Sequence, residues 1–163
     1  MSNQTFMPNL PGHSRVWIYT SSKEFTEDQV AELEKVGADF VSTWRVHGSA
    51  IAAEFKVIYN RFVVIAADEQ VAGVSGCGID SSIGFMKQAE EKYGVSLLDK
   101  LNLAYHTSEN TIGVLPMIEF QNKMDQGGIH SQTIVFNNLV ETLGELRTAW
   151  EIPLIESWHK QLL

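Results

Sequence analysis

The alternation of apolar and polar residues along the chain predicts both strands and helices. From residue 50 to residue 59, apolar residues alternate with polar ones such as Glu54 and Lys56, which indicates a strand with one face in solvent. After a tight turn near Asn60, residues 61–68 are apolar on both faces beyond Arg61, as in a central strand that is covered on both sides. The two runs therefore predict an antiparallel hairpin.

A helix is predicted before this hairpin, after a short aromatic strand over residues 15–19. Thr26 and Gln29 have the spacing of a capping box, and Phe25 precedes Val30 at the spacing of a hydrophobic staple. Apolar residues then recur with the helical period up to Trp44, so one face of the helix should be buried. We expect the helix to end at residues 47–48, where a glycine follows a histidine.

The second half of the chain contains further helix and strand patterns. A helix over residues 81–93 should have Asp80 as N-cap, and later helices should begin at Pro116 and at Thr142, the last bending at Pro153. Strands are predicted over residues 101–106, 111–115 and 133–136. The sequence thus predicts an α+β fold: a mixed, largely antiparallel sheet of about five or six strands, with helices packed mainly on one face. Residues 1–14 should form a flexible N-terminal arm, and residues 15–163 a single domain.

Charge and composition exclude several classes of function. The 163 residues carry a formal net charge of −8, which disfavours nucleic acid and anionic membrane surfaces as partners. No stretch approaches the roughly 18 apolar residues that span a bilayer, so we expect no membrane insertion. Cys77 is the only cysteine, so no internal disulfide can form, and a cytoplasmic location is expected.

Chain direction predicts one candidate site. If the helix over residues 81–93 returns along the sheet, the strand over 101–106 should lie parallel to the strand over 61–68 and reach the same end. One rim would then collect side chains from several loops: His47, Asp68, Glu69, Ser75, Cys77, Asp80 and His106. Ligand contacts are expected from part of this rim: Glu69, Ser75, Gly76, Gly78 and Asp80.

Two kinds of chemistry could use this rim. Cys77 lies between glycines ahead of the predicted helix, where a thiolate is stabilised, and His47 or His106 could act as its base with Asp68 orienting the imidazole. A packed, unreactive cysteine is the alternative, which the neighbouring Asp80 carboxylate favours because it raises a thiol pKa. The same histidines and carboxylates are suitable metal ligands, but no spacing such as HxH or HExxH supports a metal site, and neither a metal nor a cofactor is predicted.

A nucleotide site is suggested by residues 63–69 and rejected on chemistry. This apolar strand ends in Asp68 and Glu69, like a Walker B motif, and the glycines at 73 and 78 have the spacing of a phosphate loop. A working loop continues with Lys and then Ser or Thr, whereas this chain has Ile79 and Asp80. The loop also follows the Asp-Glu strand instead of preceding it. An apolar strand followed by a glycine-rich loop is the simpler interpretation.

The same stretch resembles a known family. Residues 60–62 (NRF), 68–69 (DE) and 75–80 (SGCGID), with His47 and Gly48, are similar to a family of small, uncharacterised bacterial proteins. That family is often labelled ABC transporter ATPase, although it does not have the motifs of one. The resemblance covers most of the chain from about Arg15, and it implies no established activity and no catalytic residue.

The function expected from the sequence is a non-catalytic binding or regulatory domain in the cytoplasm. Its partner would be a small molecule or a protein, and the aromatic segment from Trp150 to Leu163 could pack on a second copy in a homodimer. The alternatives are a small enzyme that uses Cys77 or a His/Asp/Glu metal site, and, third, a transporter-associated ATPase.

Overall fold

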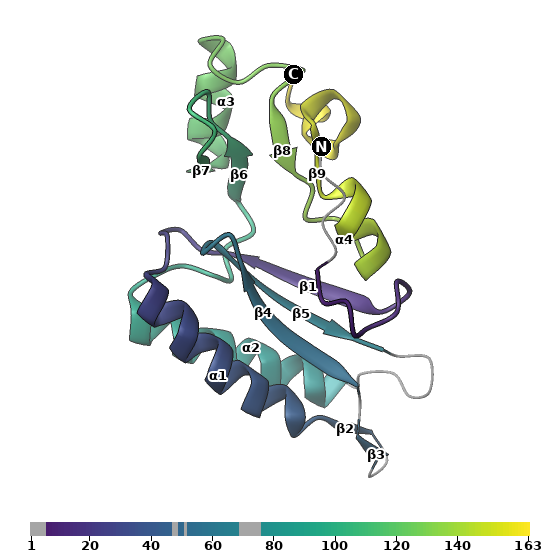
Figure 1. Ribbon diagram of the computed structural model, residues 1–163. Helices are drawn as coiled ribbons and strands as arrows, with labels where there is room; N and C mark the ends of the chain where they lie inside the picture. Colours follow the sequence, from purple (N-terminus) through teal and green to yellow (C-terminus); the bar gives the residue numbers. More distant parts are fainter. Residues whose placement is uncertain (1–5, 47–48, 51, 69–75) are drawn as a thin grey trace.

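The computed structural model describes residues 6–46, 49–50, 52–68 and 76–163, with the backbone alone at 45–46, 49–50 and 76–80. The protein has two larger sheets, and both are antiparallel (Figure 1). The first sheet has three strands in the order β1–β5–β4, and the second has four in the order β7–β6–β8–β9. The predicted α+β class is therefore confirmed. The prediction of one sheet with five or six strands is wrong, because the strands divide between two sheets.

The first sheet contains the predicted hairpin, β4 (Ala53–Ile58) and β5 (Phe62–Ala67), with β1 (Arg15–Thr20) on the other side of β5. Each residue of β5 is buried, as expected for the central strand. Tyr59 and Asn60, in the turn between β4 and β5, have φ angles of 56° and 58°, in the left-handed region that a type I′ hairpin turn requires at both central positions.

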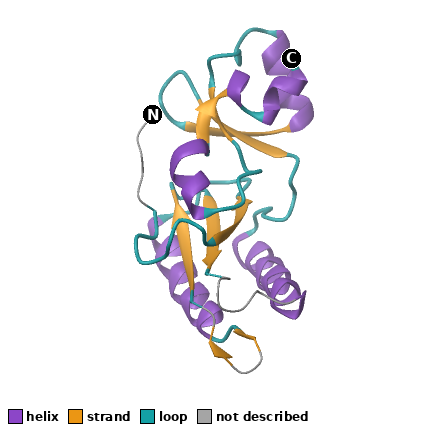
Figure 2. Cartoon of the chain, turned by 90° about the vertical axis from the view of Figure 1, so that its right-hand side faces the viewer, coloured by secondary structure: helices purple, strands orange, loops and turns teal. Residues whose placement is uncertain are grey.

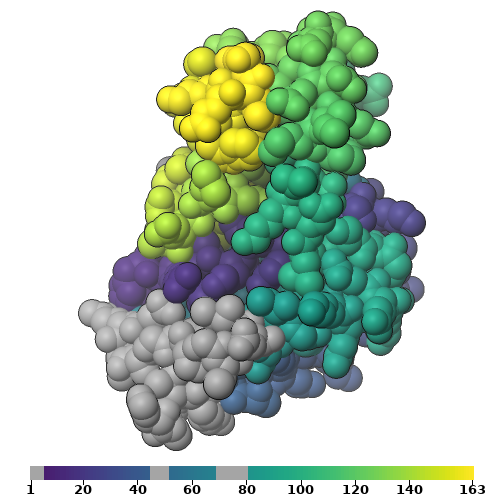
Figure 3. Space-filling view, turned by 180° about the vertical axis from the view of Figure 1, so that it is seen from behind, coloured from purple at the N-terminus to yellow at the C-terminus, as the bar shows by residue number. Residues whose placement is uncertain are grey.

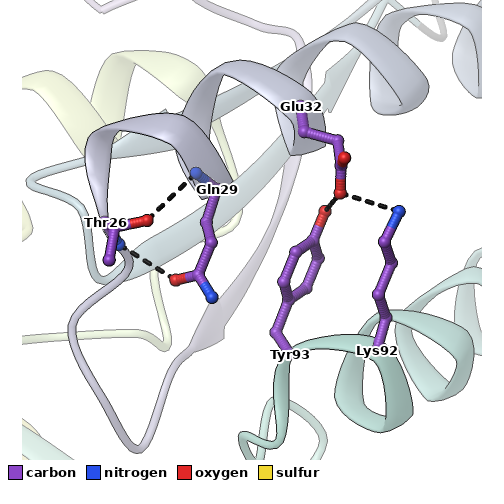
Figure 4. Close-up of polar contacts among 5 residues, drawn as sticks. All are labelled: Thr26, Gln29, Glu32, Lys92 and Tyr93. Carbon is purple, nitrogen blue, oxygen red and sulfur yellow. Dashed lines mark hydrogen bonds and ion pairs between the residues drawn. The ribbon is translucent and has the colours of Figure 1, made fainter.

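Two helices, α1 (Glu27–Ser42) and α2 (Gly76–Tyr93), cover one face of this sheet (Figure 1). The capping box of α1 is confirmed, since the side chains of Thr26 and Gln29 each accept a hydrogen bond from the other's backbone N–H (Figure 4). The helix ends at Ser42, earlier than predicted, because the chain enters the short strand β2 (Arg45–Val46), which pairs with β3 (Ser49–Ala50).

Helix α2 begins five residues earlier than the sequence predicts. Its first residue is Gly76, so Asp80 lies within the helix and is not its N-cap. At the other end, Lys92 and Tyr93 both contact Glu32 of α1, with distances to Glu32 Oε1 of 2.7 Å from Lys92 Nζ and 2.6 Å from the Tyr93 hydroxyl (Figure 4). The hydrogen bond from Lys92 lowers the pKa of Glu32. Partial burial, together with the bond to Glu32, raises the pKa of Tyr93. These contacts join the two helices across their exposed side.

Gly37 sets how closely α1 approaches the sheet, and this gives a first prediction. A Cβ atom at Gly37 would overlap the ring of Phe55, which is fixed in the core against Phe85. We expect Gly37→Ala to destabilise the protein by about 1–3 kcal/mol, despite the better helix propensity of alanine. The matched change Gly84→Ala, in α2, meets no atom within 4 Å and should stabilise by roughly 0.5–1 kcal/mol. Urea denaturation measures the free energy of unfolding of both variants. Equal changes in this free energy would contradict the close packing at Gly37.

The second sheet consists of β6 (Asn102–His106), β7 (Ile112–Pro116), β8 (Ile134–Phe136) and β9 (Glu151–Pro153). The predicted helix after Pro116 is present as α3 (Met117–Asp125), and the helix capped by Thr142 as α4 (Leu143–Ala149). The predicted continuation of this last helix past a bend at Pro153 is not formed. That proline ends the edge strand β9, where no ladder donor is needed, and two 3₁₀ turns follow, η1 (Leu154–Glu156) and η2 (Trp158–Leu162).

The elements form successive layers, as Figure 2 shows from the side, with the long helices below and the second sheet above. The face of the first sheet that α1 and α2 do not cover packs on α4 and one end of the second sheet, in a cluster that includes Phe62, Phe136 and Trp150. Part of the N-terminal arm also belongs to this cluster. The guanidinium of Arg147 donates to the carbonyl oxygens of Phe6, Met7 and Leu10, so from Phe6 onward the segment that we predicted to be flexible is packed on α4.

Candidate functional site

The rim predicted from chain direction is not formed, because Asp68 and His106 lie at opposite ends of the first sheet. Asp68 directly follows β5, and its N–H donates to the carbonyl of Ala52 at 2.8 Å. His106 ends β6, where its Nε2 lies 2.9 Å from Glu151 Oε1, and the other oxygen of Glu151 accepts a 2.7 Å hydrogen bond from the hydroxyl of Tyr59. Tyr59 is in the turn that precedes β5, so the six residues of β5, roughly 20 Å, separate it from Asp68.

The topology prediction failed for a simple physical reason. Strand β5 already pairs with β1 on one side and with β4 on the other, so no edge of β5 is open to β6. Strand β6 pairs instead with β7 and β8 in the second sheet. His106 therefore cannot serve as the base of a thiol site beside Asp68.

The other predicted rim residues are only partly placed. His47, Glu69 and Ser75 lie outside the described residues. Gly76, Cys77, Gly78 and Asp80 belong to the first turns of α2, where the backbone alone is described. The thiol chemistry of Cys77 stays a prediction, although its backbone is helical and does not form a loop ahead of the helix.

Asp68 has a partner that the sequence did not indicate. Nε2 of His13, from the N-terminal arm, lies 3.0 Å from Asp68 Oδ1. Because 55 residues separate the two, no local pattern predicts this contact. At this end of the sheet the pair joins the arm to the residue that follows β5.

The cluster of Tyr59, Glu151 and His106 joins the two sheets. Glu151 is bonded on both oxygens, the ring of His106 stacks on Phe136, and the ring of Tyr59 stacks on Trp150. Burial and the bond to Glu151 raise the pKa of Tyr59, which keeps its hydroxyl a donor. Since the three polar side chains satisfy one another and two of their rings are stacked, we interpret the cluster as an interlayer contact.

A hollow in the described part of the structure lies along β1. It has a volume of about 750 Å³, within the range of small-molecule sites. All six residues of β1 line it, including Trp17 and Tyr19, which pack on the helix side of the sheet, and Val16 and Ile18, which pack on the other side. Residues from both faces of one strand can line the same hollow only along the edge of that strand. We call this hollow the edge groove.

Two further segments form the walls of the edge groove. Residues 97–104, which lead into β6 and include most of it, contribute Leu97, Lys100 and Leu103, and residues 136–142 contribute Phe136 and Leu139. Seen from behind, the purple N-terminal strand lies between the teal segment near residue 100 and the lime segment near residue 140 (Figure 3). The remaining lining comes from the arm and the C-terminal turns: His13, Trp158 and His159.

Polar groups of the groove are held by neighbouring protein atoms. Thr20 Oγ1 accepts from the amide of Asn138 at 2.9 Å, and Asn138 in turn accepts from the indole N–H of Trp150 at 2.9 Å. His159 is only 1% exposed, and its Nδ1 lies 2.7 Å from the hydroxyl of Ser157. Burial lowers the pKa of His159 to about 4, so its imidazole is neutral near pH 7. Burial raises the pKa of Tyr19, so this groove residue also stays uncharged.

The neutral His159 predicts a pH dependence of stability. In the unfolded chain a histidine binds a proton below its usual value of 6.5, whereas the folded protein resists protonation down to about 4. The neutral His159 therefore makes its full contribution to the stability of the folded protein above pH 6.5. As the pH falls towards 4, the free energy of unfolding decreases by up to about 3 kcal/mol. Urea midpoints measured from pH 7.5 to 4.5 should fall more steeply for wild type than for His159→Asn. Parallel curves would show that folding does not lower the pKa of His159.

Only partial signals of the groove are present in the sequence. It predicted β1 as an aromatic strand, but no local feature marks which strand of a sheet has an open edge. The residue pattern places Trp158 and His159 in the last predicted helix, beyond its bend at Pro153, and His13 in the predicted flexible arm. These three side chains reach β1 through tertiary contacts that a single sequence does not reveal.

The described residues also bear on metal binding and on membrane insertion. Among the residues that the structure describes, no three or more His, Cys, Asp or Glu side chains are grouped so that they could hold a metal ion. None of the described helices is both long enough and apolar enough to cross a membrane.

Known proteins give no further guide. No protein-family model, curated protein or solved structure matches the chain. The resemblance to the family labelled as transporter ATPases remains a prediction from the residues.

Proposed function

We propose that this protein is a non-catalytic binding domain whose ligand occupies the edge groove. The observation that supports this most directly is the groove itself, about 750 Å³ in volume and lined by every residue of β1. Its lining combines aromatic and aliphatic side chains with a few polar groups, the composition typical of sites that hold a ligand by burial and orient it with hydrogen bonds. The lone Cys77 fits a reducing compartment such as the cytoplasm.

Binding is favoured over catalysis by how the polar groups of the groove are engaged. His13 is paired with Asp68, and His159 is neutral and bonded to Ser157, so the two imidazoles in the lining are engaged with protein atoms. Imidazoles that are held in place by protein atoms can form part of a rigid binding site, whereas a catalytic acid or base has to exchange a proton with the substrate. No observation on the described residues favours an enzyme built on Cys77 or the ATPase label.

A library of small organic fragments tests the proposal by NMR. The indole N–H signals of Trp17 and Trp158 should shift with many of the fragments that bind, because both side chains line the groove. Fragments that shift only signals outside the groove, or a complete lack of binding, would contradict the proposal.

A matched pair of exposed substitutions locates the binding site. Leu139 lines the groove and is 67% exposed, whereas Ile118, on α3, is 73% exposed and is not part of the lining. Either change to glutamate should cost little stability, because both side chains are in solvent. Leu139→Glu should weaken fragment binding by about tenfold, since apolar contact is replaced by a charge. Ile118→Glu should leave binding unchanged, and equal effects of the two variants would place the binding site elsewhere.

A further inference from the structure

The edge groove exposes backbone groups of β1 that have no partner within the described structure. Along β1 the N–H and C=O groups of alternate residues point to opposite sides. The N–H of Val16 donates to the carbonyl of Glu141 at 3.0 Å, on the side away from β5, whereas the N–H of Ser21 donates to the carbonyl of Arg61 at 2.7 Å, on the side of β5. The backbone groups of Val16, Ile18 and Thr20 therefore point away from β5.

Within the part of the chain that the structure describes, only the beginning of this outer edge is paired. Residues 141–143 run antiparallel to residues 14–16, with a bridge between Arg15 and Thr142 and a 2.8 Å bond from the N–H of Leu143 to the carbonyl of Ser14. Beyond it, the described residues provide no hydrogen bond to the carbonyl of Val16, to either backbone group of Ile18, or to the N–H of Thr20. These four groups have the spacing with which a strand receives a neighbour.

The opposite edge of the same sheet, on β4, is protected at Val57. The N–H of Val57 in β4 donates to Glu34 Oε2 of helix α1 at 3.0 Å, and Lys56 pairs with the same carboxylate. Proteins commonly protect exposed edges in this way, with charged side chains, prolines or covering helices. Strand β1 has Val, Trp, Ile and Tyr in succession and no proline, so its outer edge retains a strong tendency to accept a strand.

We propose that the ligand of the edge groove is an extended peptide segment of a partner protein, which adds to the first sheet as a strand beside β1. The proposal rests on the proposed binding function and specifies its ligand. Antiparallel addition would let one peptide residue pair with both backbone groups of Ile18, and the residues two positions away on each side would pair with Val16 and Thr20. About five peptide residues would be held by backbone bonds.

The lining of the groove also indicates the side chains of the peptide. One row of its side chains would face Trp17 and Tyr19, and the alternate row would face Ile18 and Phe136. The charged lining residues balance in sign, with Arg15 and Lys100 against Asp99 and Glu141. The groove therefore suits a segment of low net charge with apolar side chains.

A second copy of this chain fits the groove less well than a peptide. The edge of β1 is flanked on its far side by residues 97–104 and by the C-terminal turns. The β1 strand of a second copy would lie within the same recess of its own domain, so the two edges could not approach to the roughly 4.8 Å that strand pairing requires. A single extended chain meets no such obstacle.

The proposal is tested with the full-length protein and a library of capped hexapeptides that alternate Val, Ile, Phe or Tyr with Thr or Lys. The tightest member is then resynthesised with N-methyl groups on one edge, on the other edge, or on every residue. At least one of the peptides methylated on a single edge should bind within about threefold of the parent, because a strand uses only one edge to pair. The fully methylated peptide should lose at least about tenfold in affinity.

Two variants add an independent readout. Ile18→Pro removes the outward N–H and should weaken the parent peptide about tenfold, whereas Ile18→Val retains the N–H and should leave its affinity nearly unchanged. The peptide comparison uses the wild-type chain, so its result does not depend on how well either variant folds.

Each other outcome overturns the proposal in a recognisable way. Equal binding of the parent and the fully methylated peptide would show that backbone pairing is not used. Fragments that shift Trp17 and Trp158, without binding of any peptide, would reject a peptide ligand and retain the binding function. Failure of both libraries would reject the binding function as well. Protection of the Ile18 amide that rises with protein concentration would identify a second copy as the occupant.

Discussion

A variant with proline in place of Trp17 is expected to be largely unfolded. The N–H of Trp17 points to β5, where the residue is paired with Ile65, so proline removes a ladder hydrogen bond in the interior of the first sheet. The indole is also lost from the cluster with Trp44 and the two long helices. The backbone change alone should cost about 3 kcal/mol or more, a large share of the stability of an ordinary domain.

The same substitution one residue later provides the control. The N–H of Ile18 points into the edge groove, so Ile18→Pro removes no bond between β1 and β5. Trp17→Ala and Ile18→Ala measure the loss of each side chain, and the difference between the proline and alanine variants isolates the backbone contribution. We expect that difference to be at least about 3 kcal/mol at Trp17 and less than about 1 kcal/mol at Ile18. Circular dichroism with urea denaturation measures both, and similar penalties would mean that the outer edge of β1 is paired.

Replacing Trp150 by alanine is expected to cost about 3–5 kcal/mol. The indole is fully buried where the first sheet, α4 and the second sheet meet, and it contacts the rings of Phe6, Phe62 and Phe136. Little of the cavity should be refilled, because elements on several sides fix its walls. Chemical denaturation gives the size of the loss.

Trp150→Phe separates packing from the hydrogen bond. The phenyl ring retains much of the apolar contact but leaves Asn138 without its indole donor, so a loss of about 1–3 kcal/mol is expected. Because Asn138 also donates to Thr20, the NMR signals of Thr20 should shift in this variant. A cost below about 1 kcal/mol for Trp150→Ala would show that the two sheets do not depend on this shared core.

Features that depend on neighbouring residues could be predicted from the sequence. The capping box of Thr26 and the hairpin of β4 and β5 follow from the side chains beside them in the chain, and both are present. The burial of β5 was also predictable, since residues 62–67 are apolar on both faces. In these cases local preference and tertiary structure agree.

Features that depend on which strands meet could not be predicted. Placing strand 101–106 beside β5 required β5 to have an open edge, and β1 occupies that edge from far away in the sequence. The start of α2 was missed because Gly76 and Gly78 are typical of loops, yet the helix includes both. The predicted segment that bends at Pro153 became an edge strand because β8 provides a partner for residues 151–153.

The candidate site depended on the same long-range pairing. His106 is bonded to Glu151 and belongs to the second sheet. Of the predicted rim, Asp68 is therefore the one residue with a described side chain that lies at the expected end of the first sheet, and Asp68 is bonded to His13. The edge groove depends on the absence, among the described residues, of a strand beside the outer edge of Ile18 and Thr20, which is a property of the whole sheet. A single sequence shows that residues 15–19 favour a strand, but not that its outer side is open.

Amide hydrogen exchange along β1 in the free protein tests the central claim most directly. If the outer edge of β1 is open to the groove, the amides of Trp17 and Tyr19 should exchange slowly and those of Ile18 and Thr20 should exchange faster by orders of magnitude. Slow exchange at all four positions in dilute protein would mean that the edge is already paired, and it would contradict the account.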